Sequence, residues 1–288
     1  MIETLFSEKE FSEEVARNVA AALREDVGDG DLTARMAEGK PAARAVVISR
    51  ENAVFCGSAW FAQSFSQIDP SITIDWSLGD GDCLVPDRTL CEIRGPASAL
   101  LTGERTALNF IQFLSGVATK TRRFVEVVAG TRARIVDTRK TLPGLRYAEK
   151  FAVRCGGGLN HRHGLYDAIL IKENHIAVAG GLRPALDTAR EIAENSEGRC
   201  RFIQVEVENL GELREALDAG ASMILLDNMS INDMRKAVAL TAGRASLEAS
   251  GNIDYGNARA VAETGVDRIS IGSLTKDIRA LDLSMRFK

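Results

Sequence analysis

The chain has 288 residues, with 36 lysines and arginines against 40 aspartates and glutamates, and a formal net charge of −4. Its 45% hydrophobic and 26% charged residues are typical of a folded globular protein, and its acidic balance excludes a general polyanion binder such as a nucleic-acid-binding protein. No apolar run approaches the roughly 20 residues of a membrane helix, and the N-terminus lacks the pattern of a secretory signal. We therefore expect a cytoplasmic protein. The five cysteines form no CxxC pair, so neither a disulfide framework nor a zinc site is indicated.

The N-terminal part of the sequence predicts an α+β domain through about residue 113. A helix is expected from Ser12 to Gly28, because a capping residue and acidic residues precede an alanine-rich stretch that ends at glycine. Strand composition then predicts a hairpin within residues 42–57, and a short helix is expected over residues 60–68. Two further strands are predicted at residues 72–78 and 89–95.

Residues 98–130 have helical spacing for most of their length and connect the two halves of the chain. Arg105 lies within this helix. By pattern alone, it is an ordinary solvated helix residue.

Beyond Thr131, strands and helices alternate. Polar residues follow every strand, and Glu206, Asp227 and Glu248 are spaced 21 residues apart. This regularity favours a parallel α/β barrel, whose active site forms at the C-terminal ends of its strands. Six strands are visible in the pattern, in residues 134–138, 168–174, 202–209, 223–228, 245–251 and 268–273.

Two acids end neighbouring strands of the predicted barrel. Alternation in residues 202–209 places Gln204 and Glu206 opposite the aliphatic face, and Asp227 ends the next strand. Glu206 and Asp227 could hold Mg²⁺, which prefers oxygen ligands. They could equally line the barrel and accept hydrogen bonds from lysine and arginine.

Small residues end the last two strands, at Ser250 and Gly251 and at Gly272 and Ser273. Their backbone N–H groups could approach a phosphate closely. Alternatively, the glycines merely permit tight turns.

Residues 137–175 form a basic window in an acidic protein, with seven cations against four acids and a formal charge of +3. The strand ends carry Arg139, Lys140 and Lys172, and a triple glycine precedes His161 and Arg162. Arginine suits bidentate carboxylate binding, so the window predicts a site for a small anion. The HxH pair of His161 and His163 has no evident third ligand and has cationic neighbours, which argues against a metal site there.

Seven stretches in this order resemble the quinolinate phosphoribosyltransferase family, also called nicotinate-nucleotide pyrophosphorylase (carboxylating). The central stretch, residues 137–175, is long and highly specific. The others are residues 25–33, 103–119, 205–209, 225–228, 248–252 and 269–275.

The resemblance implies a type II phosphoribosyltransferase fold. It comprises an N-terminal α+β sandwich domain, residues 1–113, with the C-terminal tail 275–288 packed on it, and an incomplete, seven-stranded parallel α/β barrel, residues 114–274. It also implies a homodimer with shared active sites, and leaves open whether dimers assemble further.

The resemblance also implies roles for individual residues. The quinolinate pocket would be lined by Thr138, Arg139, Lys140, His161, Arg162 and Lys172, with Arg105 from the other subunit. Glu206 and Asp227 would face the ribose and Mg²⁺ of phosphoribosyl pyrophosphate, and the catalytic set would be Lys140, Lys172, Glu206 and Asp227. The 5-phosphate would contact Ser250, Gly251, Gly272 and Ser273.

The implied activity is that of a pentosyltransferase in NAD biosynthesis, which converts quinolinate and phosphoribosyl pyrophosphate into nicotinate mononucleotide, pyrophosphate and CO₂. Three alternatives stay open. They are a nicotinate-type phosphoribosyltransferase, a barrel aldolase that forms a Schiff base at Lys172, and a non-catalytic anion-binding protein.

Overall fold

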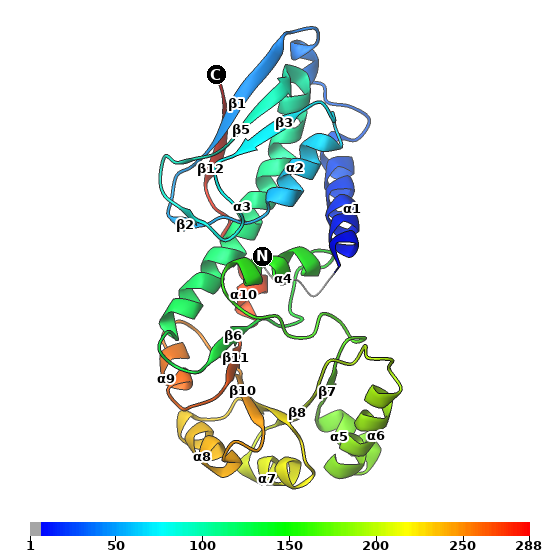
Figure 1. Ribbon diagram of the computed structural model, residues 1–288, viewed down its shortest axis with the longest axis vertical. Helices are drawn as coiled ribbons and strands as arrows, with labels where there is room; N and C mark the ends of the chain where they lie inside the picture. The colour runs from blue at the N-terminus through cyan, green and yellow to red at the C-terminus, as the bar shows by residue number, and fades with distance from the viewer. Residues whose placement is uncertain (1–6) are drawn as a thin grey trace. The chain divides into compact units, whose positions relative to one another are not determined.

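The computed structural model describes residues 7–288, which form two compact units (Figure 1). The first unit contains the described residues up to Arg122, together with residues 141–157 and Leu274–Lys288. The second contains Arg123–Lys140 and Gly158–Ser273. None of the helices within residues 7–288 is both long enough and apolar enough to cross a membrane.

The first unit is built on a four-stranded antiparallel sheet with the strand order β12-β1-β5-β3. The strands are β1 (Ala42–Ser49), β3 (Thr73–Trp76), β5 (Thr89–Pro96) and β12 (Leu283–Phe287), with a separate pair of β2 (Ala53–Val54) and β4 (Cys83–Leu84). The helices are α1 (Glu8–Val27), η1 (Ala34–Ala37), α2 (Ser58–Ser66), α3 (Ala97–Val127), α4 (Arg146–Cys155) and α10 (Ser273–Lys276), of which α3 and α10 extend past the limits of the unit.

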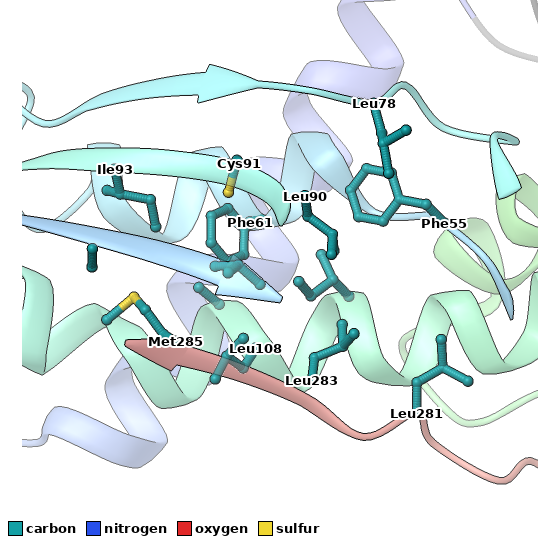
Figure 2. Packing of buried hydrophobic residues seen from close by; sticks show 14 of the residues in the cluster. Phe55, Phe61, Leu78, Leu90, Cys91, Ile93, Leu108, Leu281, Leu283 and Met285 are labelled. Carbon is teal, nitrogen blue, oxygen red and sulfur yellow. The ribbon is translucent and has the colours of Figure 1, made fainter. Parts of the chain in front are cut away.

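Apolar side chains of this sheet pack against α2 and α3 (Figure 2). Phe61 from α2, Leu108 from α3 and Ile93 from β5 are almost completely buried. Alternate residues of the strand predicted at 72–78 face this core, since Ile74 and Trp76 both pack on it. Burial of large apolar side chains is what stabilises the unit.

Two predictions for the first unit need correction. Helix α1 begins at Glu8 instead of Ser12, because Ser7 and Glu10 form a capping box one turn earlier. The expected hairpin in residues 42–57 is absent from the described structure, since β1 pairs with β5 and β12 and β2 pairs with β4. Helix α3 runs without a break across residue 113 to Val127, and residues 141–157 lie in the first unit.

The second unit is a parallel sheet of six strands with the order β6-β11-β10-β9-β8-β7. These are the six strands visible in the sequence: β6 (Arg134–Val136), β7 (Ile169–Ile171), β8 (Ile203–Val207), β9 (Met223–Asp227), β10 (Ser246–Ser250) and β11 (Arg268–Ser270). The helices between them are α5 (Glu173–Ala179), α6 (Leu182–Glu194), α7 (Leu210–Asp218), α8 (Ile231–Thr241) and α9 (Ala258–Ala262).

The sheet is an incomplete barrel. The first strand, β6, pairs with the last, β11, and on its other side β6 forms a single parallel bridge between Val136 and Leu159. Leu159 therefore occupies the place of the seventh strand that the family resemblance implied, between β6 and β7 in barrel order. Within residues 7–288 this position forms one bridge and not a strand.

Candidate active site

A cavity of about 410 Å³ opens at the C-terminal ends of the barrel strands. Every residue that lines it belongs to the second unit. The lining includes nine of the predicted site residues: Thr138, Arg139, Lys140, His161, Arg162, Lys172, Glu206, Asp227 and Ser250. The structure thus brings together residues that lie more than 100 positions apart in the sequence.

One side of the cavity is cationic. Arg162 is only 9% exposed, and its guanidinium donates a hydrogen bond to the carbonyl of Ala168 at 3.4 Å. Burial, followed by the neighbouring charge of Arg139, lowers the pKa of Arg162. Two guanidinium groups that repel each other in a confined site create a potential that favours an anionic ligand.

Lys172 and Glu206 form an ion pair across the cavity. Nζ of Lys172 donates to both carboxylate oxygens of Glu206, at 2.7 and 2.6 Å. Lys172 directly follows β7, and Glu206 comes from the adjacent strand β8. The pair fits the interpretation of Glu206 as an acid that accepts hydrogen bonds from the basic window.

Asp227 ends β9, next to β8, and accepts a hydrogen bond from the side-chain amide of Asn228 at 2.7 Å. Within residues 7–288, no group of three or more histidines, cysteines and acids is arranged to hold a metal ion. Two carboxylates from adjacent strands nevertheless suit Mg²⁺, because this ion usually takes one or two protein carboxylates and fills its shell with water and substrate phosphates.

Glycine is needed after β10 and after β11 for two different steric reasons. Gly251 has a φ of +99°, and a Cβ there would lie 2.1 Å from the side-chain oxygen of Asn228. A Cβ on Gly272 would lie 2.9 Å from Cδ of Lys140. Gly251 is thus required by its backbone conformation and by contact with Asn228, and Gly272 leaves room for the side chain of Lys140.

Four predicted residues lie outside the cavity lining: the glycines Gly251 and Gly272, together with Ser273 and Arg105. Ser273 begins α10, next to Gly272. Arg105 lies on α3 in the first unit, where it is exposed to solvent. The structure of the single chain does not bring Arg105 into the set of lining residues.

Sequence reasoning assigned no role to several polar residues of the site. Glu248 and Ser270 line the cavity, and Gln204 and Asp137 are completely buried close to His161. The period-2 pattern of β8 already placed Gln204 on the same face as Glu206. The 21-residue spacing pointed to Glu248, but the strand register pairs Asp227 with Ser250 and places Glu248 opposite Leu225, deeper in the barrel.

Comparison with known proteins agrees with this geometry. The family model described as "Quinolinate phosphoribosyl transferase, C-terminal domain" matches residues 117–286, and the corresponding N-terminal domain matches residues 31–115. The chain is 44% identical over 261 residues to a probable nicotinate-nucleotide pyrophosphorylase [carboxylating] of Bacillus subtilis, an alignment that covers 91% of this chain and 89% of the relative.

Solved structures of other proteins are also similar to this chain. A nicotinate-nucleotide pyrophosphorylase from Francisella tularensis is similar with a TM-score of 0.93 and 42% identity, covering 100% of this chain and 99% of the other. The human nicotinic acid phosphoribosyltransferase has a TM-score of 0.60 at 14% identity, covering 99% of this chain and 74% of the other. The second likeness concerns the fold alone.

Proposed function

The chain belongs to the quinolinate phosphoribosyltransferase family, and from this premise we propose that the barrel cavity transfers phosphoribose from phosphoribosyl pyrophosphate to quinolinate. The products are nicotinate mononucleotide, pyrophosphate and CO₂, so the enzyme is a pentosyltransferase of NAD biosynthesis. The observation that carries the proposal is the meeting of buried Arg162 and half-buried Arg139 with strand-end carboxylates in one cavity.

We propose that the cationic side of the cavity binds the two carboxylates of quinolinate. Arg139 and Arg162 offer planar forks that match a carboxylate, while Lys140 and Lys172 act as point charges. An entering carboxylate relieves the repulsion between the two guanidinium groups. The two neighbouring guanidinium groups therefore support an anionic ligand, such as a dicarboxylate, over a neutral one.

Glu206 and Asp227 are proposed to face the ribose and its magnesium ion, and the turns at Ser250, Gly251, Gly272 and Ser273 to accept the 5-phosphate. When bound, Mg²⁺ would neutralise charge on the departing pyrophosphate. Small residues at these positions let backbone N–H groups approach a phosphate. If Mg²⁺ is required, EDTA should abolish turnover and added Mg²⁺ should restore it.

In the proposed reaction, the pyridine nitrogen forms a bond to the anomeric carbon of the ribose, and the bond from that carbon to pyrophosphate breaks with its electron pair. Positive charge that develops at the anomeric carbon is stabilised by the carboxylates of Glu206 and Asp227. The alkylated ring is then an electron sink. The bond to the 2-carboxylate breaks, CO₂ leaves, and a proton replaces it on the ring carbon. The cationic residues hold the other carboxylate in place throughout.

Incubation with quinolinate, phosphoribosyl pyrophosphate and Mg²⁺ tests this proposal. We expect nicotinate mononucleotide, pyrophosphate and CO₂ in equal amounts. Product from nicotinate without CO₂ would favour the nicotinate-type alternative instead. Borohydride trapping of a carbonyl substrate on Lys172 would favour the aldolase, and binding of quinolinate without release of pyrophosphate would favour a non-catalytic anion binder.

We further propose that two chains share each active site, with Arg105 of one chain completing the quinolinate pocket of the other. The exposed position of Arg105 on α3 leaves it available to a second chain. Chains carrying Arg105→Ala and chains carrying Lys140→Ala should each be inactive, yet mixed dimers should recover part of the activity. If mixing gives no recovery while mixed dimers form, the proposal of a shared site is wrong.

Since both substrates carry several charges and do not cross a bilayer unaided, we place the reaction in the cytoplasm.

A further inference from the structure

A network of four polar side chains runs from His161, which lines the cavity, to Arg268. Nε2 of His161 lies 2.7 Å from Oε1 of Gln204, and Nε2 of Gln204 donates to Oε2 of Glu248 at 3.3 Å. Nε of Arg268 lies 3.1 Å from that same oxygen. His161, Gln204 and Glu248 are 6%, 0% and 1% exposed, and they come from the loop between α4 and β7, from β8 and from β10.

The contact of Arg268 with Glu248, at one end of this network, determines which atoms donate and which accept. The oxygens of Glu248 face the guanidinium of Arg268, which can only donate, so they act as acceptors. The amide nitrogen of Gln204 must therefore face Glu248, and its oxygen must face His161. It follows that Nε2 of His161 carries a hydrogen and donates it.

The other ring nitrogen is fixed as an acceptor. The backbone N–H of Arg162 donates to Nδ1 of His161 at 2.8 Å. A proton on Nδ1 would place two donors face to face, so this contact selects the neutral ring with hydrogen on Nε2. The edge-to-face ring of Phe202, 5.2 Å away, and the bond from the His161 backbone N–H to Asp137 at 2.9 Å hold the residue from two further sides.

We propose that Gln204 and Glu248 are positioning residues for quinolinate binding, acting through the tautomer and orientation of His161. Arg162 directly follows His161, and its backbone N–H is bound to the oriented ring. Release of the ring would therefore release the backbone of an arginine whose guanidinium lines the cavity. This inference rests on the proposed binding of quinolinate by that guanidinium, and it concerns residues outside the predicted binding set.

A purely structural role predicts something different. If Gln204 and Glu248 only fill the barrel interior, their loss lowers stability and the yield of active enzyme but leaves the KM of the folded enzyme unchanged. A positioning role raises the KM for quinolinate and leaves the KM for phosphoribosyl pyrophosphate unchanged. The ratio of the two KM values separates these roles.

The first experiment compares Gln204→Met with Gln204→Glu in the full chain. Methionine keeps the length and removes the acceptor opposite His161, so we expect the KM for quinolinate to rise about tenfold, the scale of one buried hydrogen bond. Glutamate keeps an acceptor there, because the like charge of Glu248 favours a proton shared between the two carboxyl groups. The KM for quinolinate should then stay within about threefold of the parent value.

Glu208→Gln is a matched control for a second variant, Glu248→Gln. Glu208 is exposed just beyond β8 and lies outside the cavity lining, so its loss should leave both KM values unchanged. Glu248→Gln keeps the side-chain volume but no longer enforces the orientation of Gln204. Its KM for quinolinate should rise less than that of Gln204→Met.

A second readout needs no substrate. The sequence has only three histidines, so ¹⁵N spectra of the imidazole groups can be assigned with His163→Gln and His175→Gln. At neutral pH, the parent should show His161 as a fixed Nε2–H tautomer, and the Nε2 resonance should shift in Gln204→Met, because its hydrogen-bond acceptor is lost. An Nδ1–H or averaging ring in the parent overturns the inference, as does an unchanged KM for quinolinate in folded Gln204→Met. A parent enzyme that makes no nicotinate mononucleotide would instead overturn the proposed function.

Discussion

The sheet of the first unit and the mouth of the barrel bury different kinds of side chain. In the first unit, the interior between the sheet and α2 and α3 is a continuous cluster of aromatic and aliphatic residues, such as Phe55, Phe61 and Leu108. At the barrel mouth, the buried residues include Arg162, Gln204 and Glu248. Burial of apolar groups stabilises a fold, whereas burial of charge costs stability unless each group finds a partner. Mutations in the apolar interior of the first unit should therefore lower stability, whereas mutations at the barrel mouth should lower activity more than stability.

The largest expected effect tests the apolar side of this contrast. Phe61 is fully buried between α2 and the sheet, so Phe61→Ala should lower the free energy of unfolding by about 3 to 5 kcal/mol. Chemical denaturation measures this loss. The folded fraction of the variant should keep the kcat of the parent, and a lower kcat at full folding would contradict the separation of stability from catalysis.

Arg139→Leu tests the charged side. We expect kcat/KM for quinolinate to fall about a thousandfold, or roughly 4 kcal/mol, because a bidentate charge-assisted contact is lost. The melting temperature should not fall, since the repulsion on Arg162 is removed at the same time. Arg214→Leu, an exposed change on α7, is the control and should alter neither quantity. A large fall in melting temperature for Arg139→Leu would instead indicate that Arg139 mainly stabilises the fold.

Asn228→Ala should give a smaller effect, mainly on catalysis. Asn228 donates to Asp227 and its side-chain oxygen lies close to where a Cβ on Gly251 would be, so it orients one acid and the following turn. Loss of one such bond should lower kcat about tenfold. Asn228 has a φ of +53°, which asparagine tolerates better than alanine, so the variant should also lose about 1 kcal/mol of stability. Steady-state kinetics beside thermal denaturation would show this, and an unchanged kcat would mean that Asp227 needs no such support.

The smallest expected effect concerns pH. Burial alone would raise the pKa of Asp167, but the N–H groups of His163 and Gly164 and the side chain of Arg201 lower it overall, below its ordinary value of 3.8. A lowered pKa contributes stability that is present at neutral pH and is lost as the pH falls through the folded-state value. Asp167→Asn should therefore cost about 1 kcal/mol at neutral pH and less below pH 3.8. Denaturation curves at both pH values check this, and an equal cost at the two values would contradict it.

Much of the second unit could be predicted because its signals are local. Each of the six strands is a short apolar run followed by polar residues, and the structure confirms all six. Nine predicted site residues share the cavity for the same reason, since parallel strands all end at one mouth. Helices α4 and α5 were not predicted, because they lie within or beside the basic window, where charge and glycine obscure helical spacing.

What the sequence could not provide depends on long-range pairing. The predicted hairpin in residues 42–57 was wrong because the partners of β1 come from residues 89–96 and 283–287. The network of His161, Gln204 and Glu248 depends on which strands are neighbours and on their register, and neither appears in any single segment. Likewise, nothing in the spacing of Arg105 predicts a role for it, and only the family resemblance suggests one.

The pairing of early strands with late ones also determines when the two sheets can form during synthesis. Val47 in β1 pairs with Met285 in β12, and Ile135 in β6 pairs with Ile269 in β11, so both sheets receive an essential strand from the end of the chain. During synthesis on the ribosome, neither sheet can be completed until residues 268–287 have emerged. Contacts so distant in sequence slow folding and leave unpaired strand edges exposed in the nascent chain. Until then, β1 and β6 each lack a native partner on one edge.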